Sequence, residues 1–240
     1  MKQWKSWGAS VPGPAHLRNG LPNQDAWCAH HYEWGDVLVV SDGLGSCPRA
    51  DVGSLAACNA VNEAADFCFK SSSMESPDLP HVIQILWRLL VYPLPPQECS
   101  ATCLFVIREE NGTVHFGMLG DGLLAAVKKN GEVELVTDDK SDSFSNFTSS
   151  LSSASPANDW KIRRAPEDIY SGFLLCSDGI ADDLMPESTG AFVQAVVERY
   201  KNYSENLRTE ELHSWLNSWP VPGHADDKTI ACLYRKEGIS

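Results

Sequence analysis

Three apolar segments of the sequence end in the same way, with an aspartate followed by a glycine. These pairs are Asp42-Gly43, Asp121-Gly122 and Asp178-Gly179. A further acidic pair, Asp226-Asp227, precedes the apolar run at residues 229–234. A single Asp-Gly after a strand is usually an ordinary turn, but four acidic strand ends that converge would repel one another unless cations lay between them. Oxygen ligands without Cys or His favour Mg²⁺ or Mn²⁺ over Zn²⁺.

Composition limits the classes of protein that this chain can represent. With 240 residues, 43% of them hydrophobic and 21% charged, the chain suits one globular domain over residues 1–240. The formal net charge of -13 argues against a nucleic-acid partner or an anionic membrane surface. No apolar run approaches the ~20 residues that span a bilayer, and no signal peptide begins the sequence. We therefore expect a cytoplasmic protein with reduced thiols at its eight cysteines.

Short apolar runs separated by turn residues predict a protein rich in β-strands. The expected strands are residues 4–10, 26–32, 37–40, 99–108, 113–119, 123–128, 132–136, 172–176 and 229–234. The four strands between residues 99 and 136 are predicted to form an antiparallel meander, because Asn-Gly and Asn-Gly-containing turns join them in two hairpins.

The clearest predicted helix covers residues 51–70. Its expected apolar face consists of Leu55, Cys58, Val61, Ala65 and Cys68. Further helices are predicted at 81–91, 190–200 and 208–215. Residues 12–23 and the serine-rich residues 138–158 are predicted as loops, the second being a flexible surface loop near the site shared by Asp121 and Asp178, or else a plain linker.

Several short motifs occur in an order that resembles one known family. They are Asn23-Gln24-Asp25-Ala26, Ser41-Asp42-Gly43-Leu44-Gly45, Gly53-Ser54, Ser100-Ala101-Thr102, Leu119-Gly120-Asp121-Gly122, Ser177-Asp178-Gly179 and Asp226-Asp227-Lys228-Thr229. Their joint order resembles the metal-dependent protein serine/threonine phosphatases of type 2C, especially the compact bacterial members. The resemblance implies an α+β fold in which two antiparallel β-sheets form a sandwich flanked by helices, a four-layer αββα arrangement with a binuclear metal site at one edge.

The same resemblance implies a role for each acidic position. Asp42 would bridge two Mn²⁺ or Mg²⁺ ions, and the Gly43 carbonyl would bind one of them. Asp178 and Asp226 would complete the set of ligands around these two ions. Asp121, together with Asp178, matches the position that holds a third, weaker ion. Asp25 matches an acidic position that approaches the ions through water.

The reaction implied is hydrolysis of phosphoserine or phosphothreonine in proteins by a metal-bridged water, since two divalent ions can activate water and neutralise phosphoryl charge. The partner would be a phosphorylated protein, in opposition to a serine/threonine kinase. No sequence signature of a covalent nucleophile is present. Two alternatives stay open: a phosphatase-like module that binds a phosphoprotein or regulatory partner with little or no turnover, and a protein that uses the ions only for stability.

The chain departs from the family pattern in several places. Arg18 is the candidate for the phosphate-binding arginine, but it stands farther from Asp25 than is usual, and a solvated loop arginine is an equal alternative. Leu44 occupies the position where some members have a histidine proposed as general acid, and bacterial relatives often have an apolar residue there too, so the proton donor is left open, with metal-bound water as one candidate. Asp227 replaces a customary asparagine, and the usual motif is missing from residues 137–142.

The histidines carry little information on their own. His30, His31, His81 and His115 are expected to be structural or exposed, because geometry and not residue type decides an acid/base role. His224 differs because it lies two residues before Asp226, but the sequence assigns no role to it.

Overall fold

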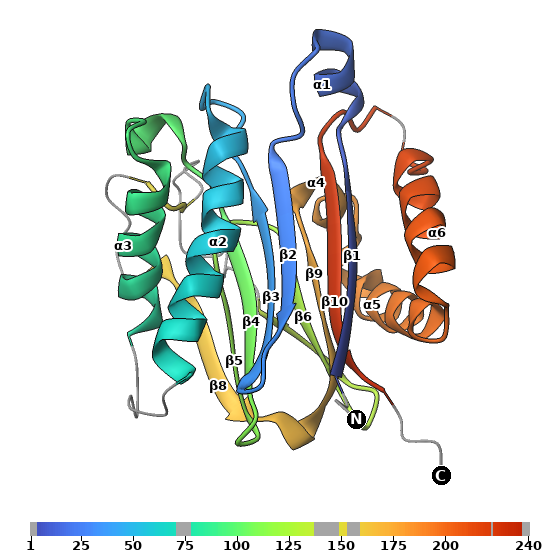
Figure 1. Ribbon diagram of the computed structural model, residues 1–240. Coiled ribbons are helices and arrows are strands. Elements are labelled where there is room, and N and C mark those ends of the chain that lie inside the picture. Colours follow the sequence, from blue (N-terminus) through green and yellow to red (C-terminus); the bar gives the residue numbers. More distant parts are fainter. Residues whose placement is uncertain (1–3, 71–77, 137–148, 153–158, 222, 237–240) are drawn as a thin grey trace.

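The computed structural model describes residues 4–70, 78–136, 149–152, 159–221 and 223–236. Two five-stranded sheets pack face to face and helices cover both outer faces, so the predicted four-layer α+β sandwich is confirmed (Figure 1).

Both sheets are antiparallel throughout. The first sheet has the order β1 (Trp4–Val11), β10 (Lys228–Arg235), β9 (Tyr170–Cys176), β6 (Leu123–Lys128) and β7 (Val133–Val136). The second has the order β2 (Asp25–His31), β3 (Gly35–Asp42), β4 (Cys103–Glu109), β5 (Thr113–Leu119) and β8 (Lys161–Pro166). The helices are α1 (Pro14–Asn19), α2 (Ala50–Phe69), α3 (Leu79–Val91), α4 (Asp178–Ala181), α5 (Pro186–Lys201) and α6 (Glu205–Asn217).

Strand β3 shows why the apolar runs become central strands. Leu38 and Val40 point into the core between the two sheets, while Val37 and Val39 pack against the helices on the outer face. All four side chains are fully buried, because a strand covered on both faces has no solvent side and reads as a continuous apolar run. Helices α2 and α3 cover the second sheet, and α5 and α6 cover the first (Figure 1).

Helix α2 packs through small residues. Its buried side includes Ala57, Ala60 and Ala64 beside the expected Cys58, Val61, Ala65 and Cys68. Leu55 is 57% exposed, so its assignment to the apolar face was wrong. Trp87 of α3 fills the space above these small residues and donates its indole N–H to the Gly53 carbonyl oxygen at 3.0 Å.

The predicted meander was wrong, because its two hairpins belong to different sheets. β4 pairs with β5 in one sheet, and β6 pairs with β7 in the other. The chain changes sheets at Gly120-Asp121-Gly122, where both glycines have positive φ angles of 93° and 113°. Strand β6 then pairs with β9, so the turn that carries Asp121 lies beside the end of the strand that precedes Asp178.

Two further elements differ from the sequence prediction. Residues 12–23 contain the short helix α1, which begins at Pro14 and ends before Gly20. Strand β8, which was not predicted, is an edge strand of mostly exposed residues, two arginines and a lysine among them. Charged edge strands are common because they discourage pairing with another chain.

Most of the serine-rich segment at 138–158 lies outside the described residues. Of the part that is described, Leu151 is fully buried and pairs through both backbone hydrogen bonds with Ala101, at 2.8 and 3.2 Å. This short stretch is therefore part of the packed structure and not a surface loop, and it lies next to Thr102, which contacts Asp42.

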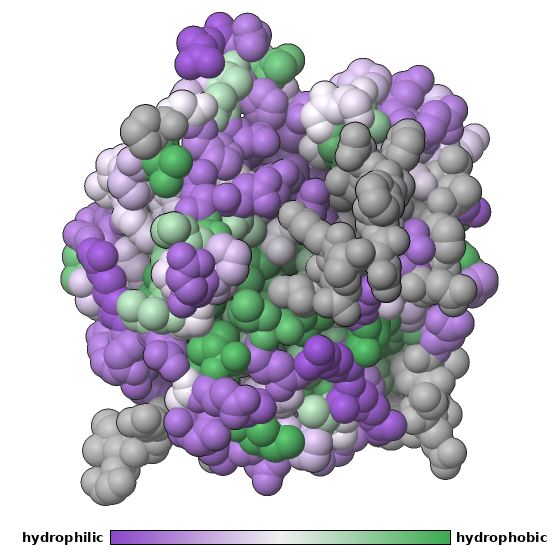
Figure 2. Space-filling model, turned by 180° about the vertical axis from the view of Figure 1, so that it is seen from behind, coloured by the Kyte–Doolittle hydropathy of each residue, from purple (hydrophilic) through white to green (hydrophobic). Residues whose placement is uncertain are grey.

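The hydropathy of the surface agrees with the polar, acidic composition of the chain. On the face turned away from the viewer in Figure 1, hydrophilic residues dominate and hydrophobic residues gather near the middle (Figure 2). Within the described residues, no helix is both long and apolar enough to cross a membrane. All eight cysteines are free, and all except Cys28 are buried.

Candidate metal and active site

Asp25 and Asp42 face each other at one edge of the second sheet. Asp25 is the first residue of β2, Asp42 is the last residue of β3, and the two are direct cross-strand partners. Like charges in such a pair destabilise a sheet. The backbone of Asp42 is held by Thr102, whose hydroxyl accepts the Asp42 N–H at 2.9 Å and whose N–H donates to the Asp42 carbonyl at 2.7 Å. The sheet therefore fixes two carboxylates side by side.

Ser177 connects this pair to the other sheet. Its hydroxyl donates to Asp25 Oδ2 at 2.7 Å and accepts the Thr229 N–H at 3.0 Å. Asp178 follows directly and begins α4. Gly179 allows the start of α4 to lie close to the backbone of Asp227, since a Cβ at this position would overlap the carbonyl oxygen of Asp227. The strand ends that carry Asp25, Asp42 and Asp178 thus meet at one edge of the sandwich.

The pKa values of these carboxyl groups show that their negative charges are close together and poorly solvated. Burial raises the pKa of Asp25 to about 7, although hydrogen bonds from Ser177 and others oppose the shift. The pKa of Asp42 is raised well above its ordinary value by burial and then by the charges of Asp25 and Asp178. Burial, followed by the charges of Asp226 and Asp121, raises the pKa of Asp178.

Asp121 and Asp226 complete the acidic group from two other loops. Asp121 lies at the change of sheets between β5 and β6, and Asp226 precedes β10. Asp226 Oδ1 accepts the N–H of Asp227 at 2.9 Å, and the buried Lys228 donates its ammonium group to the Asp226 carbonyl oxygen at 2.9 Å. Gly43 is buried, and its N–H donates to the Gln24 carbonyl oxygen at 3.0 Å.

The donor atoms at this edge suit a hard divalent cation. Asp25 and Asp178 each have one buried oxygen, Oδ1, without a hydrogen-bond partner. An unsatisfied buried carboxylate oxygen is costly, and a cation would remove that cost. Among the residues that the structure describes, no three Asp, Glu, His or Cys side chains already surround a common point in the manner of a metal site. The chemistry of these oxygen donors fits Mg²⁺ or Mn²⁺.

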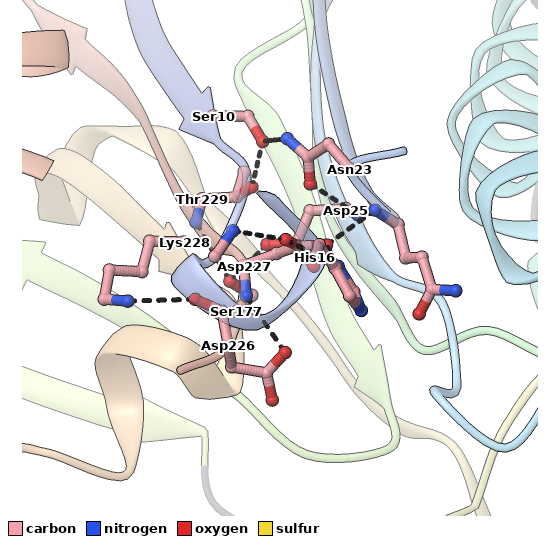
Figure 3. A network of polar contacts seen from close by, with 11 residues as sticks. Ser10, His16, Asn23, Asp25, Ser177, Asp226, Asp227, Lys228 and Thr229 are labelled. Carbon is pink, nitrogen blue, oxygen red and sulfur yellow. Dashed lines mark hydrogen bonds and ion pairs between the residues drawn. The ribbon is translucent and has the colours of Figure 1, made fainter. Parts of the chain in front are cut away.

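Asp227 anchors the segment that precedes Asp25. This carboxylate is only 2% exposed. Its Oδ1 accepts the Gly13 N–H and its Oδ2 accepts the Gln24 N–H, both at 2.6 Å, and His16 Nδ1 lies 2.8 and 2.9 Å from the two oxygens. In Figure 3 these contacts gather around Asp227 between α1 and the start of β10. Both ends of residues 13–24 are therefore fixed at one buried group.

A pocket of about 390 Å³ opens beside Asp226. It is lined by Ala15, His16, Gly223, His224, Ala225 and Asp226. His224 Nδ1 lies 2.8 Å from Asp183 Oδ1. The pocket therefore combines one of the acidic positions with two imidazole rings, each held by an aspartate.

The predicted site residues fall into two groups. Asp25, Asp42, Asp121, Asp178 and Asp226 interact electrostatically at the same edge. Arg18 instead lies exposed on α1, and the α1 residues that line the pocket beside Asp226 are Ala15 and His16. Sequence reasoning missed His16 and the anchoring role of Asp227. The replacement of asparagine by Asp227 was the available signal for both.

Three other histidines have structural partners. His31 Nδ1 contacts Asp36 Oδ1 at 2.5 Å, and His115 Nε2 contacts Glu109 Oε1 at 2.8 Å. His30 stacks on Tyr32. Asp36 and Glu109 are at the opposite ends of β3 and β4 from the acidic edge, so these contacts lie away from it.

The comparisons with known proteins agree with this architecture. The structure resembles RsbX in complex with magnesium, with a TM-score of 0.64 and 15% identity over 98% of this chain and 97% of that chain. It also resembles a bacterial serine phosphatase (TM-score 0.66, 16% identity, 98% and 99% of the two chains) and the serine/threonine phosphatase Stp1 from Staphylococcus aureus (TM-score 0.65, 16% identity, 98% and 95%). At these identities the likeness shows a shared fold. No curated protein sequence matches significantly.

The sequence itself also matches a family description. The model of the protein phosphatase 2C family aligns with residues 12–217, which include Asp25, Asp42, Asp121 and Asp178 and end before Asp226. Because this match covers most of the chain, the protein belongs to the protein phosphatase 2C family.

Proposed function

We propose that this protein is a metal-dependent phosphatase that hydrolyses phosphoserine or phosphothreonine in proteins, in opposition to a serine/threonine kinase. The observation that carries the proposal is the close group of the buried Asp25 and the half-buried Asp42 and Asp178, whose pKa values are raised by burial and mutual charge. A protein gains nothing in stability from such a group. Carboxylates arranged at such a cost point to a functional site.

The residues would divide the work as follows. Asp42, Asp178 and Asp226, with the Gly43 carbonyl, would hold two Mg²⁺ or Mn²⁺ ions, and Asp121 would help to hold a weaker third. When bound, such ions activate water and neutralise the charge on phosphoryl oxygens.

Two other residues would act around these ligands. Asp25 would orient the cluster through its bond with Ser177 and contact the ions through water. Arg18, exposed on α1, would meet the phosphorylated protein as it approaches this edge.

The test is phosphate release from phosphoserine and phosphothreonine peptides, measured with Mn²⁺, with Mg²⁺ and with excess chelator. We expect turnover only when metal is present. Asp42→Asn should lower turnover by at least about 100-fold without changing the far-UV circular dichroism spectrum, because Asp42 lies at the end of its strand and outside the apolar core. The matched control is Asp168→Asn, which removes an exposed charge just before β9. Asp168 lies at the opposite end of β9 from Asp178.

The same experiment distinguishes the enzyme from a binding module. Calorimetry with the phosphopeptide reports binding independently of turnover. Metal-dependent binding with no phosphate release under either metal would favour the module. Phosphopeptide binding that is unchanged by excess chelator would place the ligand site elsewhere in the molecule.

A further inference from the structure

Two histidines line the pocket beside Asp226, and an aspartate holds the same ring nitrogen of each. His16 Nδ1 contacts Asp227, and His224 Nδ1 contacts Asp183 at 2.8 Å. When Nδ1 is engaged in this way, Nε2 is the ring nitrogen that can meet a substrate. The pocket thus brings two imidazole rings next to Asp226, an acidic position of the proposed metal site.

His16 is the more firmly placed of the two rings. Both oxygens of its partner Asp227 lie within 2.9 Å of Nδ1. The same two oxygens accept the backbone N–H groups of Gly13 and Gln24. Gln24 directly precedes Asp25, so one buried carboxylate fixes the position of His16 relative to the acidic cluster.

The position where a proton donor would otherwise be sought is apolar. Leu44 follows Asp42-Gly43, and its half-buried side chain cannot transfer a proton. A serine or threonine alkoxide is a strong base, so breaking its bond to phosphorus is much easier when the oxygen is protonated at the same time.

We propose that His16 is the general acid of the phosphatase reaction, with Asp227 as the residue that orients it; this inference rests on the proposed function. Water adds to phosphorus and releases one proton to solvent. The bond from phosphorus to the serine or threonine oxygen breaks with both electrons on that oxygen, which takes the proton from His16 Nε2. The imidazole regains a proton from solvent. Asp227 orients the ring and compensates its positive charge, as the aspartate of a hydrolase triad does.

The test compares two substrates that differ in their need for a general acid. A phosphoserine peptide has a poor leaving group, whereas p-nitrophenyl phosphate releases a stable aryl oxide that leaves without protonation. His16→Asn retains an amide N–H in the place of Nδ1, so it can still bind Asp227, but it lacks Nε2. We expect kcat for the phosphopeptide to fall by about 100-fold or more, and kcat for p-nitrophenyl phosphate to change by less than about threefold.

The chain contains a matched control. His31 has its Nδ1 on Asp36 in the same manner, but it is six residues along β2 from Asp25, about 20 Å away. His31→Asn should leave both rates unchanged. His16→Gln serves as a second variant if His16→Asn does not fold.

Each other outcome has a defined meaning. Equal losses on both substrates, or no loss on either, would overturn the role of His16 while leaving the phosphatase assignment intact. A selective loss in His224→Asn but not in the His16 variants would also overturn it. Wild-type protein that hydrolyses neither substrate would overturn the proposed function and this inference together.

Discussion

Replacing Asp25 by asparagine should stabilise the metal-free protein, because the charge of Asp25 lies in an unfavourable place. The side chain is 8% exposed and directly opposite Asp42. Burial is the main reason that its pKa is raised from 3.8 to about 7. A carboxyl group that resists ionisation in the folded state lowers stability at any pH where the unfolded chain is ionised.

The direction and size of the effect follow from the two pKa values. Below pH 3.8 the group is protonated in both states and costs nothing. Stability then falls as the pH rises from 3.8 to about 7, and above that range the full cost is present. A difference of about three in pKa corresponds to about 4 kcal/mol, which is an upper limit for what the substitution can recover. Asparagine must still accept the Ser177 hydroxyl, so we expect a gain of about 1–3 kcal/mol at pH 8 and none near pH 4.

Urea unfolding in the presence of chelator, at pH 8 and at pH 4, measures this gain. Asp168→Asn removes one exposed charge far from the cluster and controls for net charge. Saturating Mn²⁺ should reduce or reverse the difference, since a metal at 100 times its Kd stabilises the wild type by about 2.7 kcal/mol and the variant by less. A variant that is no more stable than wild type at pH 8, or equally stabilised at both pH values, would refute the argument from burial.

Two further predictions concern the residues that support this edge and the opposite end of the sheet. Gly179→Ala should destabilise the protein by about 1–3 kcal/mol and weaken Mn²⁺ binding, both measurable by thermal unfolding with and without metal, because its Cβ would push against the Asp227 carbonyl. Asp36→Asn should cost about 3 kcal/mol at pH 7, because Asp36 is fully buried between His31 and Arg108. Burial alone would raise the pKa of Asp36, but these two partners lower it; the stabilisation is therefore present above about pH 4 and lost at lower pH, where urea unfolding should show the two proteins converging.

The sequence predicted the acidic edge because its signal is local. The strands that deliver Asp42 and Asp178 are buried on both faces, so a short apolar run followed by Asp-Gly marks each of them clearly. The apolar runs did not predict which strands pair with each other. The hairpins β4–β5 and β6–β7 look the same in sequence whether they form one sheet or two, and only the glycines on both sides of Asp121 marked the change of sheets.

Polar and short elements escaped prediction for a different reason. Strand β8 is held by backbone pairing with β5 and has mostly exposed, charged side chains, so it lacks the alternating pattern that identifies a strand. Helix α1 has six residues, too few to show a helical period. It is stabilised by tertiary contacts, chiefly those that His16 and Gly13 make with Asp227, which a local pattern does not record.

Two departures from the family pattern have a common physical cause at Asp227. Three donor groups, the N–H groups of Gly13 and Gln24 and the His16 ring, meet the two oxygens of this side chain. Asparagine has only one acceptor oxygen, and its NH₂ group would face one of the N–H donors that surround this position. Only a carboxylate therefore satisfies the arrangement. The longer segment between Arg18 and Asp25 and the change of asparagine to aspartate at 227 therefore belong together. The carboxylate closes the segment and, by accepting the Gln24 N–H, fixes the residue next to Asp25, so that α1 and the start of β2 are held by one side chain.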